Sequence, residues 1–293
     1  MSAYVGEDGP GASAPSRGDG SDEIARLRRR YIDLTQLALT HLLYRPFDIR
    51  WDENPEPDDY SGSDELREAA AKEFAREDFD WASVRADGRD WPQYAQTMVG
   101  LKRLANVRDC VERVIADDVP GDLIETGVWR GGVVILMRAI LDAYDDRERI
   151  VFAADSFRGV PPPNEDAYPA DAGSRLHTAK ALAISREDVE RNFDLYGLFD
   201  ERVQILEGWF KDSLPAVKDR TWSVVRLDGD LYESTMDALS NLYHGLSVGG
   251  FLIVDDYGHG PCRQAVTDFR DAHGVDEPIE PIDWLGAFWR RAH

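Results

Sequence analysis

Few features of secreted, membrane-spanning or disulfide-stabilised proteins occur in this sequence. Its 293 residues include only two cysteines, Cys110 and Cys262, which implies no disulfide framework and fits a reducing compartment. No apolar run approaches the roughly 20 residues that are needed to cross a bilayer. The first residues, MSAYVGEDGPGASAPSRGDGSDE, lack the basic start and the apolar core of a signal peptide. We therefore expect a cytoplasmic protein that has no membrane partner.

Positive charge is also scarce. The sequence has 34 basic and 56 acidic residues, so its formal net charge is −22 at pH 7. Nucleic acids and anionic membranes attract basic surfaces, and this balance therefore argues against both as partners. Hydrophobic residues make up 43% of the chain, which is enough for a real core. These numbers favour a globular protein with a small-molecule partner.

The N-terminal part of the chain changes character twice. Residues 1–21 are rich in Gly, Ser, Pro and Asp, which predicts a disordered tail. Residues 22–116 carry apolar side chains at steps of three and four and form an expected helical region. Its expected helices begin at Asp22, run from a cap at Ser63 or Asp64 to about Phe79, and span Leu101–Ala116. Their apolar stripes predict packing on a neighbouring subunit, so we expect a homo-oligomer, a dimer or larger.

Residues 117–293 alternate between strands and helices. The expected strands are Asp122–Thr126, Ile150–Asp155, Val203–Glu207, Trp222–Asp228 and Gly250–Asp255. The expected helices are Gly132–Tyr144, Glu187–Tyr196, Thr235–Gly245 and Cys262–His273. Two final strands flank a turn at residues 283–286. This alternation predicts an α/β fold with a mostly parallel, seven-stranded sheet and helices on both faces.

A glycine-rich loop follows the first expected strand. It reads LIETGVWRGGVV, with Glu125 before Gly127, Gly131 and Gly132. The spacing E-x-G-x-x-x-G-G differs from the dinucleotide pattern G-x-G-x-x-G and is typical of S-adenosylmethionine (SAM) methyltransferases. Glycines let the backbone approach a ligand closely, and the acid can meet the SAM ammonium group. An ordinary strand-to-helix turn is the alternative interpretation.

The next two strand ends complete a nucleoside site. Asp155 ends the second strand, where an acid commonly binds a ribose hydroxyl pair. It can instead cap the turn that follows. Gly208, Trp209 and Phe210 follow the third strand and can stack on an adenine ring, although the two aromatic residues fit the core equally well.

Paired carboxylates follow the fourth and fifth strands. Asp228 and Asp230 stand in RLDGDLYEST, and Asp255 and Asp256 stand in GGFLIVDDYG. If the two strands are neighbours, the acids converge at the carboxyl edge of the sheet. An all-oxygen ligand set suits Mg²⁺, and zinc is disfavoured because the strand ends carry no Cys or His. As alternatives, these acids are turn residues or a helix cap.

Taken together, these motifs resemble the macrocin O-methyltransferase family. The resemblance rests on ETGVWRGG, DSFRGVPPP, LDGDLYESTMDALSNLY and GGFLIVDDYG, and it extends from about Thr97 to Trp289. It implies the class I SAM-methyltransferase fold, a Rossmann-like architecture, over residues 117–293, with the helical region 22–116 contributing a lid. It also implies methylation of a sugar hydroxyl on a glycosylated small molecule, as in antibiotic biosynthesis, with SAM and Mg²⁺.

The resemblance further assigns roles to single residues. It implies Asp228, Asp255 and Asp256 as metal ligands and Asp230 as the general base. Asp256 can instead lie behind the ligands, because neighbouring strand residues point to opposite faces and both acids can ligate only if the strand end bends. The implied cofactor-binding residues are Thr97, Met98, Glu125, Thr126, Gly127, Gly131, Asp155, Ser156, Gly208, Trp209, Phe210 and Asp228.

Two other functions remain open from the sequence. The same chemistry can act on a catechol or another phenol, although such enzymes typically use a lysine near the metal and none stands beside Asp228 or Asp255. The chain can also be a catalytically silent, SAM-binding partner subunit, which would have no need of four convergent carboxylates. His259 is a candidate for substrate contact, and residues 158–181 form a long segment that suits a lid over the acceptor.

Overall fold

The computed structural model describes residues 20–44 and 80–293. The helix expected from Ser63 or Asp64 lies outside the described residues, as does nearly all of the expected tail 1–21. Within the described part, the first helix begins at Gly20, two residues before the predicted start at Asp22.

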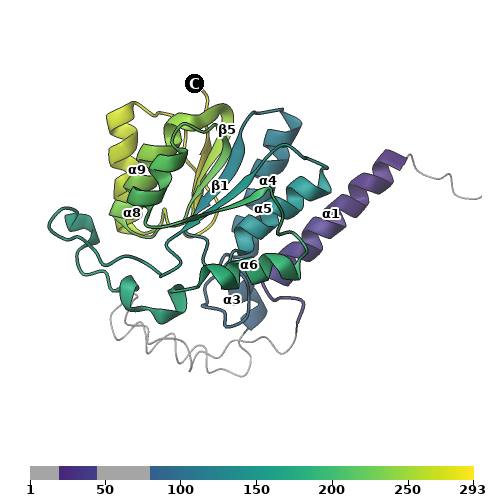
Figure 1. The fold of residues 1–293 in the computed structure, drawn as a ribbon, viewed down its shortest axis with the longest axis horizontal. Helices are drawn as coiled ribbons and strands as arrows, with labels where there is room; N and C mark the ends of the chain where they lie inside the picture. Colours follow the sequence, from purple (N-terminus) through teal and green to yellow (C-terminus); the bar gives the residue numbers. More distant parts are fainter. Residues whose placement is uncertain (1–19, 45–79) are drawn as a thin grey trace, which may run out of the picture.

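A single seven-stranded sheet forms the centre of the fold (Figure 1). The strand order is β3-β2-β1-β4-β5-β7-β6, with β1 to β5 parallel and β7 antiparallel to both of its neighbours. The strands are β1 Asp122–Thr126, β2 Val151–Asp155, β3 Val203–Glu207, β4 Trp222–Leu227, β5 Leu246–Val254, β6 Glu280–Pro281 and β7 Ala287–Arg290. The predicted sheet is therefore confirmed, although β5 begins four residues earlier than the predicted Gly250.

Helices cover both faces of this sheet. They are α1 Gly20–Leu39, α3 Trp81–Asp87, α4 Leu101–Ala116, α5 Gly132–Ala143, α6 Arg186–Leu195, α7 Phe210–Ser213, α8 Tyr232–Leu242 and α9 Gly260–His273. Short 3₁₀ helices lie between β2 and α6 at Pro169–Asp171, Leu176–Thr178 and Lys180–Leu182, and others at Leu214–Val217 and Tyr243–Gly245. The sequence did not predict α3, which begins where the Asp80 side chain accepts a hydrogen bond from the Ser83 N–H.

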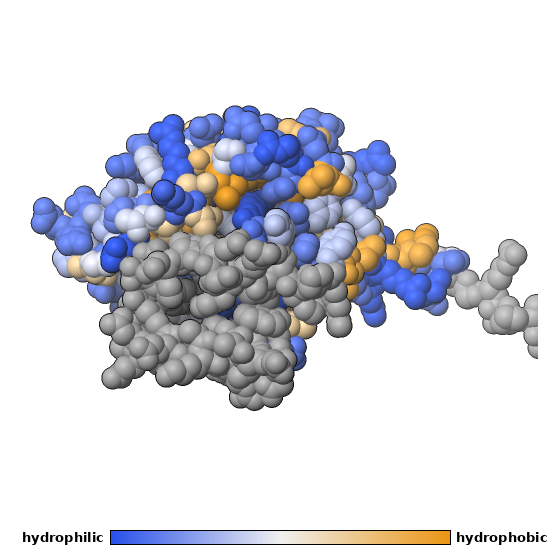
Figure 2. All heavy atoms as spheres, turned by 90° about the horizontal axis from the view of Figure 1, so that it is seen from below, coloured by the Kyte–Doolittle hydropathy of each residue, from blue (hydrophilic) through white to orange (hydrophobic). Residues whose placement is uncertain are grey.

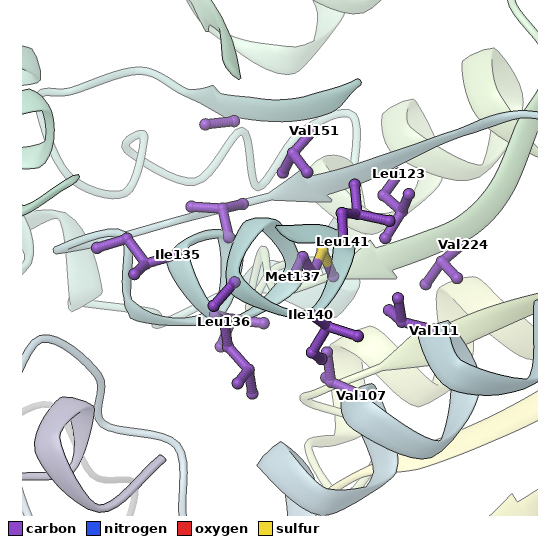
Figure 3. Close-up of a cluster of buried hydrophobic side chains, with 14 of the residues drawn as sticks. Val107, Val111, Leu123, Ile135, Leu136, Met137, Ile140, Leu141, Val151 and Val224 are labelled. Carbon is purple, nitrogen blue, oxygen red and sulfur yellow. The ribbon is translucent and has the colours of Figure 1, made fainter. Parts of the chain in front are cut away.

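Alternation along the strands separates two hydrophobic cores. Leu123 and Val224 face α4, α5 and α6, and Figure 3 shows α5 side chains such as Met137 in this core. Ile124 and Val225 face the opposite core, which α8 and α9 cover. Strand residues alternate between the two faces of the sheet. The face toward which each polar strand residue points therefore follows from its position relative to these core residues.

The N-terminal helices belong to the first of these cores. Ile32 and Leu39 of α1 and Val107 of α4 pack in the same buried cluster as the sheet residue Leu123. The division of the chain at residue 116 stays a prediction, since α4 shares its core with the rest of the fold. Among the helices of the described residues, none is long and apolar enough to span a bilayer.

Candidate active site

Two adjoining cavities open at the carboxyl edge of the parallel strands. The smaller, of about 330 Å³, lies at the ends of β1, β2 and β3, and the larger, of about 560 Å³, lies at the ends of β4 and β5. Both are large enough for a small ligand. The residues that line both cavities are Met98, Trp129, Leu182, Asp228 and Asp230. The cavities therefore meet at the D-x-D pair that the sequence singled out.

Most of the predicted cofactor residues line these cavities. Those in the smaller cavity are Met98, Gly127, Asp155, Ser156, Gly208, Trp209, Phe210 and Asp228. Thr97 and Glu125 line the larger one, and Met98 and Asp228 line both. Thr126 and Gly131 line neither: Thr126 is fully buried, and Gly131 is the N-cap residue just before α5, with a φ of 84°. Their predicted contacts with a cofactor stay untested predictions.

The glycine loop is shaped by close backbone approaches. Gly127 has a φ of 86°, and a β-carbon there would lie 1.6 Å from the Asp228 carbonyl oxygen. At Gly132, a β-carbon would lie 2.6 Å from the Gln96 carbonyl oxygen and 2.7 Å from Thr97. These glycines therefore bring β1 against the end of β4 and let the segment around Thr97 pack onto the start of α5.

Asp155 holds the glycine loop in place. Its Oδ2 accepts hydrogen bonds from the N–H groups of Val128 at 2.8 Å and Trp129 at 3.3 Å. Its Oδ1 accepts from the N–H of Phe157 at 2.8 Å, which is the turn-capping role that the sequence left open. Burial raises the pKa of this carboxyl group. The side chain also lines the smaller cavity, and binding of ribose stays a prediction.

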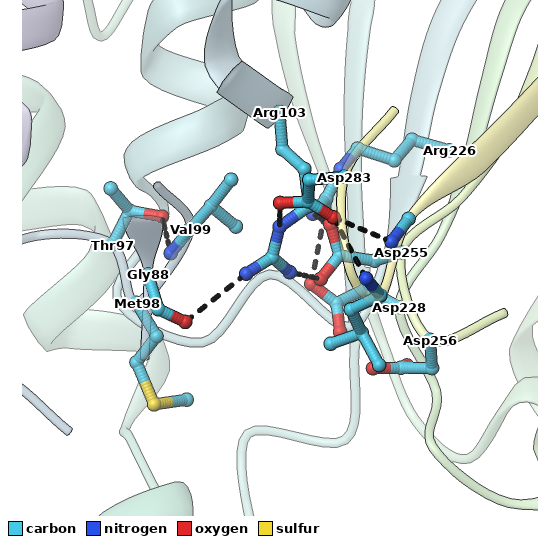
Figure 4. Close-up of polar contacts among 12 residues, drawn as sticks. Gly88, Thr97, Met98, Val99, Arg103, Arg226, Asp228, Asp255, Asp256 and Asp283 are labelled. Carbon is cyan, nitrogen blue, oxygen red and sulfur yellow. Dashed lines mark hydrogen bonds and ion pairs between the residues drawn. The ribbon is translucent and has the colours of Figure 1, made fainter. Parts of the chain in front are cut away.

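A buried arginine links three strand ends. Arg226 of β4 is fully buried and lies opposite Glu125 of β1 in the sheet register. Its guanidinium donates to Glu125, to Asp228 at 2.8 Å and to Asp255. Figure 4 shows Arg226 beside Asp228 and Asp255. Asp228 follows Arg226 by two residues, so both point to the same face of the strand. The carboxylates of β1, β4 and β5 are therefore gathered around one cation.

A second arginine reaches the same cluster from α4. Arg103 donates to the other oxygen of Asp255, and its Nε donates to Asp283 at 3.1 Å. Asp283 also accepts the N–H groups of Leu285 and Gly286, which fixes the turn between β6 and β7. Asp255 is thus held from both sides, in Figure 4 between Arg103 and Arg226.

Carboxylates outnumber arginines in this cluster. Two guanidinium groups face Glu125, Asp228, Asp230, Asp255, Asp256 and Asp283. Burial and repulsion by Asp255 raise the pKa of Asp228 well above its ordinary value, and burial and Asp230 do the same for Asp256. Burial would raise the pKa of Asp255 as well, but Arg103 and Arg226 hold it below its ordinary value.

Two sets of side chains could hold a cation in the described residues. Oxygen atoms of Asp228, Asp255 and Asp256 lie within 4.8 Å of one another, as do ligand atoms of Asp230, Asp256 and His259. β5 ends at Val254, and residues 255–258 form a turn, so the bend that both aspartates need is present. The first set is the one that the resemblance implied.

Asp230 lies at the junction of the cavities. Its φ is 59°, in the left-handed region that Asp tolerates better than most residues, and its N–H donates to Asp256 at 3.0 Å. Burial, followed by Asp228 and Asp255, raises its pKa to about 7. A carboxylate with such a pKa is suited to accept a proton near neutral pH.

One oxygen of Glu125 has no hydrogen-bond partner. Arg226 bonds to its Oε1, whereas its Oε2 is buried and unpaired. Burial raises the pKa of this group to about 8, and Arg226 only partly opposes the rise. An ammonium group in the larger cavity would satisfy the unpaired oxygen, as the sequence predicted.

The sequence interpretation missed the arginines of the site. Arg226 and Arg103 were not singled out, and neither was Arg85, which donates to the carbonyl oxygens of Met98 and Val99. A signal was present for Arg226, because it interrupts the apolar strand WSVVRL just before the acidic pair. In the segments that contain Arg103 and Arg85, the sequence pattern gives no reason to single out an arginine.

The long segment between β2 and α6 forms walls of both cavities. Gly159, Val160 and Asn164 line the smaller cavity, and residues 170–176 line the larger one. We call residues 158–181 the lid segment. Its function as a lid stays a prediction.

Comparisons with known proteins agree with this geometry. The family model of the macrocin O-methyltransferases (TylF) matches residues 28–291. A tetracenomycin rhamnosyl 4'-O-methyltransferase from Streptomyces olivaceus is 48% identical over 90% of this chain and 93% of its own length. Demethyldecarbamoylnovobiocin O-methyltransferase from Streptomyces niveus is 54% identical over 71% of this chain and 80% of its own.

A solved structure gives the same result for the fold. The O-methyltransferase NovP superposes with a TM-score of 0.77 at 45% identity, covering 91% of this chain and 100% of that chain. The strand order with an antiparallel β7 is that of the class I SAM-methyltransferase fold. The family model and both relatives indicate an enzyme rather than a silent partner subunit. The chain belongs to the macrocin O-methyltransferase family and is an O-methyltransferase.

Proposed function

We propose that this enzyme methylates a sugar hydroxyl of a glycosylated natural product, with SAM as the methyl donor and Mg²⁺ at its acidic cluster. The observation that carries the proposal is the convergence of Asp228, Asp230, Asp255 and Asp256 where the two cavities meet. The relative from Streptomyces olivaceus is named for a rhamnosyl acceptor, which supports a sugar as the methylated group here.

The residues of the smaller cavity fit SAM. Trp209 and Phe210 offer aromatic faces for an adenine ring, and the half-buried Asp155 lies where a ribose would bind. Glu125 lines the neighbouring cavity and has an unpaired oxygen, and we propose that it accepts a hydrogen bond from the amino-acid end of the donor. When bound, SAM supplies an electrophilic methyl group.

The acidic cluster fits a divalent cation. Asp228, Asp255 and Asp256 provide carboxylate oxygens, the ligands that Mg²⁺ prefers. Each oxygen of Asp255 already accepts from an arginine but retains a second lone pair. Burial, together with repulsion by neighbouring carboxylates, raises the pKa values of Asp228 and Asp256, and a cation would relieve this repulsion. A bound cation would supply positive charge that orients the acceptor and acidifies its hydroxyl.

Asp230 is the proposed general base. It lines both cavities, so its carboxylate faces the place where donor and acceptor would meet. It would take the proton of the acceptor hydroxyl as the new C–O bond forms and the bond between sulfur and the methyl group breaks.

A metal-removal experiment with a matched acceptor pair tests this function. The acceptor is the rhamnosyl tetracenomycin that the name of the Streptomyces olivaceus relative specifies, and its partner is the same compound without the rhamnosyl group. We expect methylation of the first compound only, abolished by EDTA and restored by Mg²⁺ but poorly by Zn²⁺, because the set formed by Asp228, Asp255 and Asp256 offers neither sulfur nor imidazole. Full turnover of metal-stripped enzyme would refute the metal, and methylation of the sugar-free compound or of catechol would refute the sugar.

The projecting helix α1 supports a further part of the proposal, a homo-oligomer. One face of α1, with Ile32 and Leu39, packs in the core. Another face exposes a stripe with steps of three, four and three residues, which consists of Ile24, Leu27, Tyr31 and Leu34. Figure 2 shows apolar side chains along this projecting helix. Such spacing is typical of helix pairing, and we propose that a second copy of this chain covers the stripe.

Both cysteines bear on the compartment. Cys110 and Cys262 are buried and free, and burial raises the pKa of both thiols. Unpaired, protonated cysteines support our proposal that the enzyme works in the reducing cytoplasm.

A further inference from the structure

A buried carboxylate joins the lid segment to helix α8. Asp171 ends a 3₁₀ turn of the lid segment, and only 1% of its surface is exposed. Its Oδ1 accepts the N–H of Tyr232 at 2.6 Å, and its Oδ2 accepts the N–H of Glu233 at 3.0 Å. The bonded residues are 61 and 62 positions apart, so this contact is not part of a local turn.

Helix α8 depends on this contact for its cap. Its N-cap residue is Leu231, and no side chain of the helix start itself accepts a backbone hydrogen bond there. The first N–H groups of a helix need external acceptors, and a negative charge at this end also complements the helix dipole. Asp171 supplies both the acceptor oxygens and the negative charge, although it belongs to a segment that is distant in the chain.

The start of α8 directly follows residues 228–230, which carry the proposed base and which we call the catalytic turn. Asp230 precedes Leu231, and its left-handed backbone is fixed by the N–H bond to Asp256 on one side. On the other side, the position of the helix start determines where Asp230 points. A carboxylate that fixes Tyr232 and Glu233 therefore also restricts Asp230, two positions before Tyr232.

The same contact sets the wall of the larger cavity. Residues 170–176 line that cavity, and the rings of Tyr168 and Tyr232 lie 5.8 Å apart beside the contact. The end of the lid segment is attached separately, because the Trp129 Nε1 donates to the Ala181 carbonyl oxygen at 2.8 Å. The attachment at Ala181 thus joins the lid segment to the glycine loop, and the attachment at Asp171 joins it to the start of α8, next to the catalytic turn.

We propose that Asp171 is a positioning residue of the methyl transfer. It fastens the lid segment to the start of α8, and by this single contact it holds both the acceptor cavity and the Asp230 carboxylate in their working positions. The inference rests on the proposed role of Asp230. Both carboxylate oxygens of Asp171 are engaged by the N–H groups of Tyr232 and Glu233, and Asp171 acts through these two residues.

Three variants in the lid segment test the proposal. Asp171→Ala removes both acceptors, Asp171→Asn keeps one carbonyl oxygen, and Asp166→Ala removes an exposed carboxylate of the same segment as the control. We expect kcat to fall by about 10²-fold in Asp171→Ala, the cost of displacing a catalytic group by about 1 Å. Asp171→Asn should retain more activity than Asp171→Ala, and the control should match the wild type.

Two further measurements separate positioning from a general loss of structure. The Kd for SAM, measured by titration calorimetry, should change far less than kcat. Trypsin should cleave after the exposed Arg175 and Lys180 sooner in Asp171→Ala than in the control, because cleavage reports local opening. The melting temperature should show that the variants remain folded.

A backbone variant tests the contact without changing Asp171. Tyr232→Pro removes the N–H that donates a hydrogen bond to Asp171. Proline is tolerated at the first residue of a helix, the position that Tyr232 occupies in α8. The preceding Leu231 has an extended ψ of 156°, which proline also allows. Tyr232→Ala removes the same ring but keeps the N–H, so it is the matched control. We expect lower kcat and faster tryptic cleavage in Tyr232→Pro than in Tyr232→Ala.

The outcomes distinguish this inference from the proposed function. Wild-type kcat in folded Asp171→Ala, or equal behaviour of Tyr232→Pro and Tyr232→Ala, would overturn the positioning role while the proposed function stands. Unchanged tryptic cleavage would also overturn it. If Asp230→Asn is fully active, the proposed base is wrong and this inference falls with it.

Discussion

Gly127 at the end of β1 lies so close to Asp228 at the end of β4 that a β-carbon at Gly127 would lie 1.6 Å from the Asp228 carbonyl oxygen. The two residues come from neighbouring strands that are 101 positions apart in the chain. The contact therefore couples the glycine loop of the smaller cavity to the first carboxylate of the acidic cluster.

Gly127→Ala should damage both parts of the site. The added methyl group meets backbone rather than a movable side chain, and its φ of 86° disfavours any L side chain. We expect a loss of about 1–3 kcal/mol in stability from overpacking, together with weaker binding of SAM. Urea denaturation and calorimetric titration measure the two effects. Gly20→Ala is the control, because nothing lies within 4 Å of its β-carbon position. Near-normal SAM binding in Gly127→Ala would show that the contact does not shape the loop.

Arg226→Leu should be among the most destabilising single substitutions in the chain. It leaves the carboxylates of Glu125 and Asp255 buried without the cation that they share. Removing one partner of a buried ion pair costs about 3–5 kcal/mol. Arg186→Leu removes a half-exposed arginine from a surface pair and should cost at most about 1 kcal/mol. Similar unfolding free energies for the two variants would contradict the structural role of Arg226.

Asp228→Asn and Asp230→Asn should fail in different ways. Asp228→Asn removes charge from the proposed metal ligands, so turnover should recover partly at high Mg²⁺. Asp230→Asn cannot accept a proton, and kcat should fall by roughly 10²–10⁴-fold without rescue by metal. Titration of kcat with Mg²⁺ separates the two. Rescue of Asp230→Asn alone would reverse the proposed roles.

Asp155→Ala should weaken binding of SAM. The variant loses the proposed ribose contact as well as the bonds to Val128 and Trp129 that hold the glycine loop. We expect a loss of about 1–3 kcal/mol in binding free energy, the scale of hydrogen bonds to a charged group. An unchanged Kd for SAM in the folded variant would rule out the ribose assignment.

Leu27→Glu combined with Leu34→Glu should separate the subunits of the proposed oligomer. Both leucines are exposed on the face of α1 that points away from the core. The substitutions therefore place negative charge in the proposed interface between the paired helices without disturbing the core. Light scattering coupled to size-exclusion chromatography should show a smaller particle with unchanged helical content. Arg30→Ala, on the same helix, should leave the mass unchanged. A wild type that is already monomeric would refute the oligomer.

Most helices and strands could be predicted from the sequence because their sequence patterns are local. The run from Trp222 to Leu227 is mostly apolar and ends at acids, and the structure contains β4 over those residues. Helix α4 shows its apolar side at steps of three and four residues over its whole length. The seven-residue α3 has too few turns to show such a period, and only its cap at Asp80 marks it.

The contacts that complete the site could not be predicted in the same way. The partner of Arg226 in β1 depends on the register between two strands, and Arg103 reaches Asp255 from 152 positions away. Asp171 stands in a segment without periodicity, and its partners lie beyond two further strands. A sequence shows which acids end the strands, whereas the cations that balance them follow from the packing of distant elements.

The two cavities differ in what builds them, and this has an evolutionary consequence. The smaller cavity is formed mainly by strand ends and the residues that follow them. Much of the larger one is formed by connecting segments, namely residues 88–99, 170–176, 258–261 and 284–285. Connecting segments tolerate substitution and changes of length better than strands do. If the larger cavity holds the acceptor, as we propose, we expect the acceptor range to change, in nature or by segment exchange, more readily than the methyl-transfer machinery does.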